Sequence, residues 1–295
     1  MRIRNKVLWI VIIFAISGML VSFFIFSCIS GSSESGLIDP NAFNVVWSKD
    51  SMSLYYIHTK NEMEIGNDGT LYQYDIRTRQ RRRIGYYSEF RDISPTGQEI
   101  VTVPLPDEMG SISGYVKVTD LTTEKARIIY RLADHSSEPS VSWLETDQIV
   151  IVEVFQRDTK LSVFDLRNGL SYSRLINTDS SVDVGIDGQV IGYSTGGNYI
   201  ISEIQSGKIL STMPESECLG AHWLSRHRLI GTTQHYEDFE MDLTTMNRKL
   251  FDMGIPDRMG GILSPDTRRV AAMPIGGGDW YNTPPNNLYI FRRGK

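Results

Sequence analysis

The sequence predicts an all-β protein, a six-bladed β-propeller of four-stranded blades, preceded by one N-terminal transmembrane helix. Three observations predict this fold class. An uncharged apolar segment of 21 residues lies near the N-terminus. A strand that ends in a polar turn, usually after an acidic residue, recurs six times along the rest of the chain. No stretch after the apolar segment keeps a 3.6-residue apolar period, so the repeated units are expected to consist of strands.

The apolar segment is Val7–Ser27. A helix of this length spans about 31 Å at 1.5 Å per residue, which matches the hydrocarbon core of a bilayer. Arg2, Arg4 and Lys6 precede it and no cation follows closely, so the positive-inside rule places the N-terminus in the cytoplasm. We therefore expect residues 1–6 to be a cytoplasmic stub and residues 7–27 to be a transmembrane anchor or signal segment. The bulk of the chain is then extracytoplasmic, either periplasmic or at the cell surface.

Two other fates of the apolar segment stay open. Small residues around Ser30 are compatible with cleavage of a signal peptide. The stretch Ile25-Phe26-Ser27-Cys28 resembles a bacterial lipobox with Cys28 as the acylated residue, although Phe26 departs from the small or aliphatic residue of that pattern. In each case residues 28–36 are expected to form a short linker, and residues 37–295 the propeller.

The charge and the cysteine content exclude some classes of function. Residues 28–295 carry 27 basic and 35 acidic side chains, a balance that does not indicate nucleic-acid binding. Cys28 and Cys218 are the only cysteines, and they are far apart in the sequence. We therefore expect neither an internal disulfide nor a thiolate metal site.

Two elements recur in each unit and define four strands. The first is a turn followed by an apolar strand, as in DISPTGQEIVTV and ILSPDTRRVAAM. The second is a strand that ends in an acidic residue, as in VKVTDLTTEK and LSVFDLRNG. Its last position is occupied in turn by Asp75, Asp120, Asp165, Glu203, Asp242 and, in the final copy, Arg292. Four strands per unit match strands a to d of a propeller blade, and each aspartate is expected to cap the c–d turn through backbone N–H groups.

The last unit ends with its c strand, four residues before the terminus at Lys295. An uncovered sheet edge is unfavourable, so another segment is needed there. Residues 37–43 directly follow the linker and are predicted to supply the missing outer strand, which would close the ring.

The repeats resemble the TolB-type propeller repeat, in which a W-S-P-D-G turn precedes an apolar strand and a later strand ends in D-L-x-T-G. The matching residues are Trp47-Ser48-Lys49-Asp50, Ser94-Pro95-Thr96-Gly97 and Ser264-Pro265-Asp266 for the first part, and Asp120-Leu121-Thr122-Thr123 and Asp165-Leu166-Arg167-Asn168-Gly169 for the second. The resemblance implies a six-bladed propeller and, for some relatives, contacts between envelope proteins. The additional α/β domain of TolB has no counterpart among these residues, so its partners are not carried over.

Gly192-Tyr193-Ser194-Thr195-Gly196 matches the G-x-S-x-G pattern of serine hydrolases. A nucleophile elbow requires a strand followed by a helix, whereas NYIISEI follows here and reads as a strand. Gly196-Gly197-Asn198 favours a tight hairpin. We therefore expect Ser194 to lie in a b–c hairpin and not to act as a nucleophile.

The b–c connections predict a recognition surface. Three of them are long, residues 58–70, 104–114 and 274–287, and the blades that carry them are neighbours in a closed ring. Loops of this kind are a common place for binding residues. The candidate ligand-binding residues are Trp280, Tyr281, Glu62, Glu64, Asp68, Asp107 and Glu108, with His235 from the densest polar group elsewhere. Aromatic rings beside carboxylates suit a basic peptide or a sugar.

No cofactor site and no metal site is predicted. The spacings of His222, His227 and His235 fit no standard zinc pattern, and no phosphate loop or dinucleotide fingerprint is present. The basic run Arg77–Arg83 has two readings, a charged outer blade edge that prevents edge-to-edge pairing or a docking site for an anionic partner.

Three hypotheses of function follow. The first is a binding module: a membrane-tethered, extracytoplasmic propeller that recognises a protein or an envelope polymer through its b–c loop face. The alternative is a propeller-fold carbohydrate-active enzyme, a lyase or glycosidase, with His58 or His235 and acidic residues around the axis. The third is an inert scaffold within a larger complex. A ring of His, Asp or Gln side chains around the axis would favour the enzyme.

Overall fold

The computed structural model describes residues 36–59, 69–87, 89–103, 114–133, 139–144, 147–155, 158–178, 182–185, 189–225, 227–235, 237–254, 259–274 and 287–293. The predicted membrane segment and residues 28–35 of the predicted linker, Cys28 among them, lie outside this range, whereas Gly36 already belongs to a strand. Within it, no helix has the length and apolar character needed to cross a bilayer.

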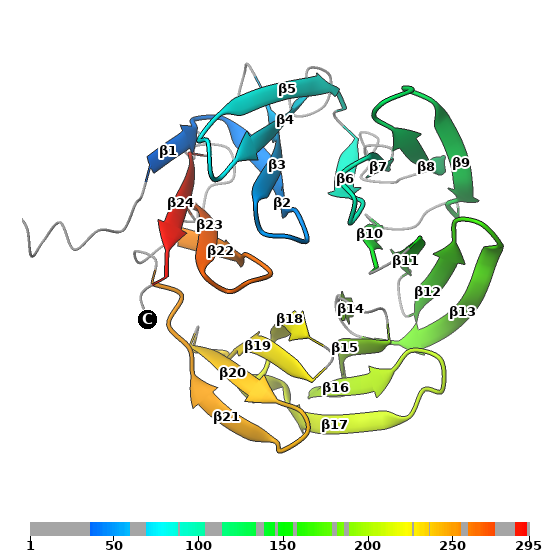
Figure 1. The fold of residues 1–295 in the computed structure, drawn as a ribbon. Helices are drawn as coiled ribbons and strands as arrows, with labels where there is room; N and C mark the ends of the chain where they lie inside the picture. Colours follow the sequence, from blue (N-terminus) through cyan, green and yellow to red (C-terminus); the bar gives the residue numbers. More distant parts are fainter. Residues whose placement is uncertain are drawn as a thin grey trace, which may run out of the picture.

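The described residues form six four-stranded antiparallel sheets arranged around a central axis, as predicted (Figure 1). From the axis outward, blade 1 contains β2 (Ala42–Trp47), β3 (Ser53–His58), β4 (Thr70–Asp75) and β5 (Arg81–Tyr86). Blade 2 contains β6 (Phe90–Ile93), β7 (Glu99–Thr102), β8 (Tyr115–Asp120) and β9 (Ala126–Arg131). Blade 3 contains β10 (Ser140–Trp143), β11 (Gln148–Val154), β12 (Asp158–Asp165) and β13 (Gly169–Asn177).

The second half of the ring repeats this order. Blade 4 contains β14 (Val182–Val184), β15 (Val190–Thr195), β16 (Asn198–Glu203) and β17 (Ile209–Pro214). The short 3₁₀-helix η1 (Glu215–Glu217) leads to blade 5, which contains β18 (Gly220–Ser225), β19 (Arg228–Thr232), β20 (Asp238–Asp242) and β21 (Asn247–Leu250). Blade 6 contains β22 (Met259–Leu263), β23 (Arg269–Pro274), β24 (Leu288–Arg292) and, as its outer strand, β1 (Gly36–Asp39).

The hydrophobic core is divided among the interfaces between blades. Each of the six clusters of buried apolar side chains among the described residues joins two neighbouring blades. Side chains alternate between the two faces of a strand. In β11, Ile149 and Ile151 pack toward blade 2, whereas Val150 and Val152 pack toward blade 4. A central strand therefore buries both faces, which explains why these segments read as continuous apolar runs instead of alternating ones.

The N-terminal strand closes the ring, as the sequence predicted. Leu37 of β1 pairs with Tyr289 of β24 in antiparallel register, so the first described strand completes the last blade. Figure 1 shows β1, in blue, beside β24, in red. The strand is shorter than the predicted segment, since residues from Ala42 onward already belong to β2 of blade 1.

A buried carboxylate fixes this closing strand to blade 1. The side chain of Asp39 is fully buried and accepts hydrogen bonds from the backbone N–H of Asn41 at 2.9 Å and from Arg81 at 2.5 Å. Nδ1 of His58 lies 2.7 Å from Oδ1 of Asp39. The Arg81 guanidinium in turn stacks on the ring of Tyr72 at 4.2 Å. Residues of β1, β3, β4 and β5 thus meet at the seam of the ring.

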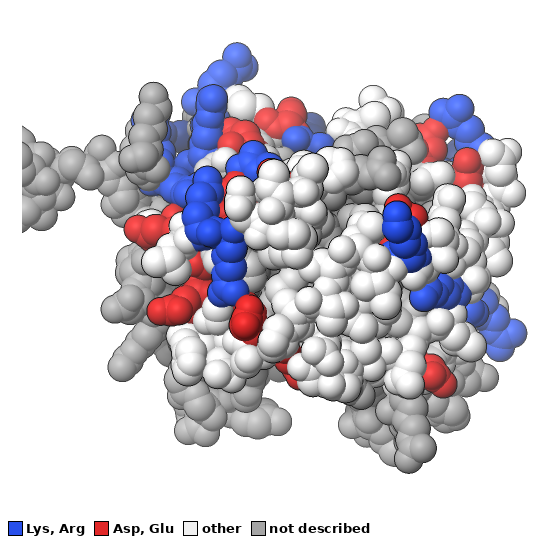
Figure 2. All heavy atoms as spheres, turned by 90° about the horizontal axis from the view of Figure 1, so that it is seen from below, with Lys and Arg blue, Asp and Glu red and all other residues white. Residues whose placement is uncertain are grey.

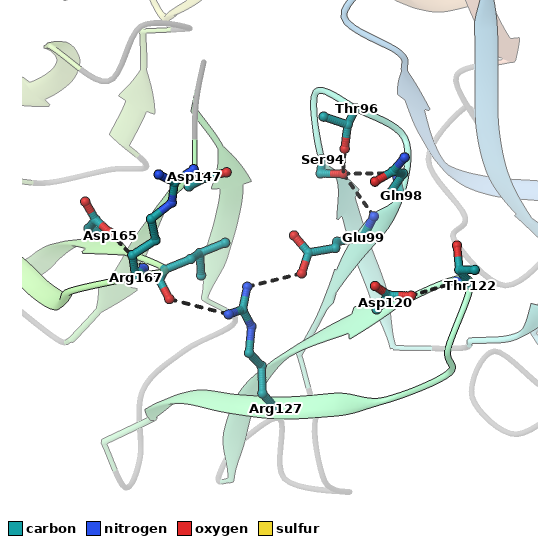
Figure 3. A network of polar contacts seen from close by, with 11 residues as sticks. Ser94, Thr96, Gln98, Glu99, Asp120, Thr122, Arg127, Asp147, Asp165 and Arg167 are labelled. Atoms are coloured by element: carbon teal, nitrogen blue, oxygen red, sulfur yellow. Dashed lines mark hydrogen bonds and ion pairs between the residues drawn. The ribbon is translucent and has the colours of Figure 1, made fainter.

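The turns of the repeat have the expected polar chemistry (Figure 3). In blade 2, the Ser94 hydroxyl accepts the backbone N–H of Glu99 at 3.0 Å, which closes the a–b turn. Asp120 accepts the N–H groups of Thr122 and Thr123 at 2.8 and 2.7 Å, which closes the c–d turn. These hydrogen bonds lower the pKa of Asp120. The equivalent residues Asp75, Asp165 and Asp242 bind turn N–H groups in the same way, so the repeated aspartates have a structural role.

The arginine run divides between two environments. Arg77 and Arg79 lie in the c–d turn, and only Arg81–Arg83 belong to β5, so the run does not present one continuous face. Arg81 contacts Asp39, while Arg82 donates to Gln73. Around the side of the ring, basic and acidic side chains are interspersed with uncharged surface (Figure 2). This mixture of charges is typical of protected outer edges.

We expect Asp39→Ala to lower the free energy of unfolding by about 3 kcal/mol, because it removes the acceptor of Arg81 and of the Asn41 N–H at a closed seam. Denaturant unfolding of the full chain in detergent measures this change. Arg82→Ala is the control, since Arg82 lies on β5 directly after Arg81 but is exposed, and it should change stability by less than about 0.5 kcal/mol. Equal effects of the two substitutions would show that the seam does not depend on Asp39.

Candidate functional site

The innermost strands of all six blades enclose a cavity of about 670 Å³ on the axis of the ring. This volume lies in the range of small-ligand pockets. The cavity reaches the a–b turns, because Lys49, Pro95 and Pro265 of three such turns line it. It therefore lies toward the face opposite the b–c connections. Its walls are mainly apolar, and the charged or titratable side chains that line it are Lys49, Arg91, Asp92, Asp183 and His222.

The two carboxylates of the cavity join neighbouring inner strands. Asp92 of β6 accepts the backbone N–H of Ile93 and, across the interface, that of Trp143 in β10, both at 2.7 Å. Asp183 of β14 accepts the hydroxyl of Tyr199 at 2.7 Å and, in the next blade, the N–H of Ala221 at 2.8 Å. The blades are separate sheets, so their inner strands form no ladder of backbone hydrogen bonds with one another. In both cases a carboxylate side chain forms a hydrogen bond between two of these inner strands instead.

Burial changes the protonation of these groups. It raises the pKa of Asp92 to about 6, against the opposing effects of the two N–H donors and of Lys49. It also raises the pKa of Asp183, although Tyr199 and the Ala221 N–H lower it in part. The side chain of His222 is exposed to the cavity, but the ring encloses it and separates it from bulk solvent. This enclosure, and secondly the nearby Lys49 ammonium, lower the pKa of His222. The imidazole is therefore neutral at pH 7.

The predicted ligand-binding residues separate into two groups. Trp280, Tyr281, Glu62, Glu64, Asp68, Asp107 and Glu108 lie outside the described residues. His235 is described and exposed in the b–c connection of blade 5, where its Nε2 lies 3.3 Å from the side-chain nitrogen of Gln234. It does not line the cavity. The lengths of the b–c connections follow from the strand bounds and confirm that the long ones belong to blades 1, 2 and 6.

The sequence did not identify the charged residues of the cavity. Each lies on an innermost strand or just after it, close to the a–b turn of its own repeat. The side chain of His222, for example, projects into the cavity, whereas its neighbour Trp223 is buried. An alignment of the inner strands of the repeats would have shown polar residues at Asp92 and His222, each directly before a large buried side chain, Ile93 and Trp223. Among the described residues, no three His, Cys, Asp or Glu side chains are grouped closely enough to hold a metal ion.

The G-x-S-x-G stretch lies in a b–c hairpin, as predicted, although Ser194 belongs to strand β15 itself and the turn is Gly196-Gly197. Gly196 and Gly197 have φ values of 57° and 75° and connect β15 directly to β16. Gly192 is needed for packing, since a Cβ there would lie 2.0 Å from the hydroxyl of Tyr199. Ser194 is 1 % exposed, and its hydroxyl has no hydrogen-bond partner among the described residues. Both glycines of the pattern therefore have structural explanations, and the serine is not accessible to a substrate.

Comparison with known proteins supports the fold of this chain but does not assign the chain to a family. No family model matches the chain, and no curated protein matches it. Among solved structures, a chain of the mitotic checkpoint complex is similar with a TM-score of 0.52, 15% identity, and coverage of 86% of this chain and 75% of that chain. Oligogalacturonate lyase from Vibrio parahaemolyticus is similar with a TM-score of 0.50, 11% identity, and coverage of 85% and 78%.

TolB from Acinetobacter baumannii is also among the similar structures, with a TM-score of 0.47 and 13% identity. The alignment covers 85% of this chain and 54% of TolB, so the chain corresponds to about half of that protein. At identities of 15% and 11%, the likenesses to the checkpoint-complex chain and to the lyase show only the β-propeller fold, which many unrelated functions share.

We expect Ser194→Ala to leave the free energy of unfolding unchanged or to raise it by up to about 1 kcal/mol, because the substitution removes a buried hydroxyl that has no partner. Thr178→Val is the matched comparison. The Thr178 hydroxyl donates to the Ser194 carbonyl at 2.8 Å, so its loss should destabilise the protein by about 1 kcal/mol. Thermal unfolding of both variants measures the contrast, and a clear destabilisation by Ser194→Ala would contradict the structural reading of this serine.

We expect the stability difference between wild type and Asp92→Asn to depend on pH. An unfolded aspartate ionises near pH 3.9, and folded Asp92 does so at about 6. The folded state holds the proton more tightly, so the wild type loses stability relative to the non-titrating variant as pH rises from about 4 to about 6. The full pKa shift of Asp92 corresponds to a change in unfolding free energy of at most about 3 kcal/mol. Because part of the carboxylate is open to the cavity, we expect a smaller change. Unfolding curves across this pH range measure it; a constant difference would contradict the raised pKa.

Proposed function

We propose that this protein is a binding module, an extracytoplasmic six-bladed propeller tethered to a membrane by residues 7–27, whose ligand is a protein or an envelope polymer. The tether rests on the sequence: a 21-residue uncharged segment behind three cations. Cleavage of this segment, or acylation of Cys28, would change the mode of attachment and not the side of the membrane.

The observation that carries the proposal is the uneven distribution of loop length on one face of the ring. The b–c connections of blades 1, 2 and 6 contain 11, 12 and 13 residues, whereas those of blades 3, 4 and 5 contain 3, 2 and 5. A b–c hairpin needs only two to five residues, so the longer connections exceed what the fold requires. They occur on three consecutive blades of the ring, and long loops on adjacent blades suit recognition of a macromolecule.

The chemistry of the cavity also favours binding over catalysis. Both of its carboxylates already accept hydrogen bonds that hold inner strands together. The cavity at the opposite face has a single exposed histidine, His222. Among the described residues of the cavity, the carboxylates therefore serve to hold the inner strands together and form no evident acid–base pair with His222.

A second candidate function is a carbohydrate-active enzyme, and one observation favours it. Asp92 lies in the wall of a ligand-sized cavity with a pKa of about 6, a value that suits a general acid or base at neutral pH. If the protein cleaves an acidic polysaccharide and Asp92→Asn abolishes that cleavage while the fold is retained, the enzyme reading replaces the binding reading.

Cross-linking of the full-length protein in its native membranes tests the binding proposal. Trp280→Ala with Tyr281→Ala should reduce capture of the partner by about tenfold or more, because aromatic side chains at the centre of an interface carry much of its affinity. Leu170→Ala is the control, since Leu170 is 57% exposed but lies on the outer strand β13, away from the b–c connections. If every captured species is unchanged in the Trp280 and Tyr281 variant, the three long loops are not the binding surface.

A further inference from the structure

The outer strand of blade 3, β13, has an open edge. It pairs with β12 on one side and, among the described residues, with no strand on the other. With nine residues it is the longest outer strand of the six described blades. Figure 1 shows it at the rim of the ring, three blades away from β1, where the described chain begins. Such an edge presents backbone N–H and C=O groups that another strand can bind.

The other described outer strands carry features that hinder such pairing. β5 contains three exposed arginines, and β9 exposes Arg127 and Arg131. β21 has only four residues, of which Arg248 and Lys249 are exposed cations. β1 is equally short, and β17 ends in Pro214, which cannot donate a backbone hydrogen bond. Charge, short length and proline are the usual protections of a sheet edge, whereas β13 is long and contains no proline.

The one charged side chain of β13 packs against the next blade. Arg174 is half-buried, and its guanidinium lies against the c–d turn of blade 4, where a Cβ added to Gly207 would come 2.6 Å from Nη1. Its neighbours Ser173, Leu175 and Asn177 are exposed and uncharged, and they share one face of the strand. Leu175 is 66% exposed. These side chains do not repel a second strand.

Symmetry restricts how this edge can pair with a copy of itself. A two-fold axis perpendicular to the sheet keeps the same face of β13 on the same side in both copies, so one residue must lie opposite itself. β13 follows β12 without a bulge over residues 172–177. An axis at Ser173 or Ile176 lies too near an end of this segment, and an axis at Arg174 places two like charges opposite each other. The remaining position for the axis within the segment is Leu175.

The register centred on Leu175 is complementary to itself. Leu175 meets the same leucine of the other copy, so two exposed apolar side chains leave water together. Ser173 lies opposite Asn177, and a hydroxyl and an amide can exchange a hydrogen bond. Arg174 lies opposite Ile176, so the two arginines do not face each other. This self-complementary pattern favours a second copy of the chain over an unrelated strand.

We propose that two copies of this chain associate through antiparallel pairing of β13 with Leu175 on the two-fold axis, so that the two copies of blade 3 form one continuous sheet with four strands from each copy. The contact is small, so the association is weak and depends on a high local concentration. It uses no residue of the axial cavity or of the long b–c connections. The pairing therefore goes beyond the proposed function and is independent of it.

Disulfide trapping in the full chain in detergent tests the register. Leu175→Cys should form a covalent dimer on mild oxidation, because opposite residues of an antiparallel pair have Cα atoms about 4.5–5.5 Å apart, which a disulfide can span. Leu170→Cys is the matched control, since Leu170 is also an exposed leucine of β13 but would lie about 30 Å from its own copy. Leu175→Cys should cross-link at least about tenfold faster than Leu170→Cys. The wild-type chain, with Cys28 and Cys218, gives the background.

A charge at the axis tests the association without a new thiol. Leu175→Lys should weaken self-association at least about tenfold in sedimentation equilibrium, because two lysines would face each other and the leucine contact is lost. Leu210→Lys is the matched control, since Leu210 is an exposed leucine of β17, the outer strand of the next blade, and it should leave self-association unchanged. Association through the apolar N-terminal segment is common to both variants and does not contribute to their difference. Thermal unfolding verifies that each variant is folded.

Three results would overturn the proposal. The first is cross-linking of Leu175→Cys no faster than that of Leu170→Cys. The second is a full chain that stays monomeric up to about 1 mM. The third is an equal association constant for Leu175→Lys and Leu210→Lys, which would place the contact between copies elsewhere. None of these results bears on capture of a partner through the b–c loops, so the two proposals can fail separately.

Discussion

The fold depends on packing between the faces of neighbouring sheets. Every central strand buries side chains on both sides, so a single blade has two apolar faces that only other blades can cover. The ring must therefore be complete for any blade to be stable. Completion requires an outer strand for blade 6, and β1 supplies it from the other end of the described chain. The buried Asp39 then fixes this strand to blade 1 through Arg81 and His58.

The same constraint creates the candidate site. Closing six sheets around an axis leaves their innermost strands without a neighbouring strand on the inner side, and a cavity remains between them. The strands are held to one another by side chains: Asp92 and Asp183 accept backbone N–H groups of the next blade, and the Trp47 indole donates to the carbonyl of Ile262 at 2.9 Å. Side chains without such a task, Lys49 and His222 among them, project into the space and define its chemistry.

Short motifs acquire their meaning from the strands that surround them. The letters of G-x-S-x-G occur here because Gly192 makes room for Tyr199, and Gly196 adopts a positive φ in a two-residue turn. The serine between them is buried. The repeated aspartates show the same principle, since Asp120 and its equivalents are acidic because turn N–H groups need an acceptor. In both cases a local backbone requirement accounts for residues that resemble functional ones.

The sequence by itself determined the architecture, because the period of the repeats, the continuous apolar strands and the turn residues are local patterns that survive in degenerate copies. It also determined that residues near position 37 close the ring and that Ser194 lies in a hairpin. Only the tertiary structure decided which side chains meet at the axis. Lys49, Asp92 and His222 belong to blades 1, 2 and 5 and are far apart in the chain, so no local pattern relates them. Their proximity arises from the radius and closure of the ring, which depend on how all six interfaces pack together.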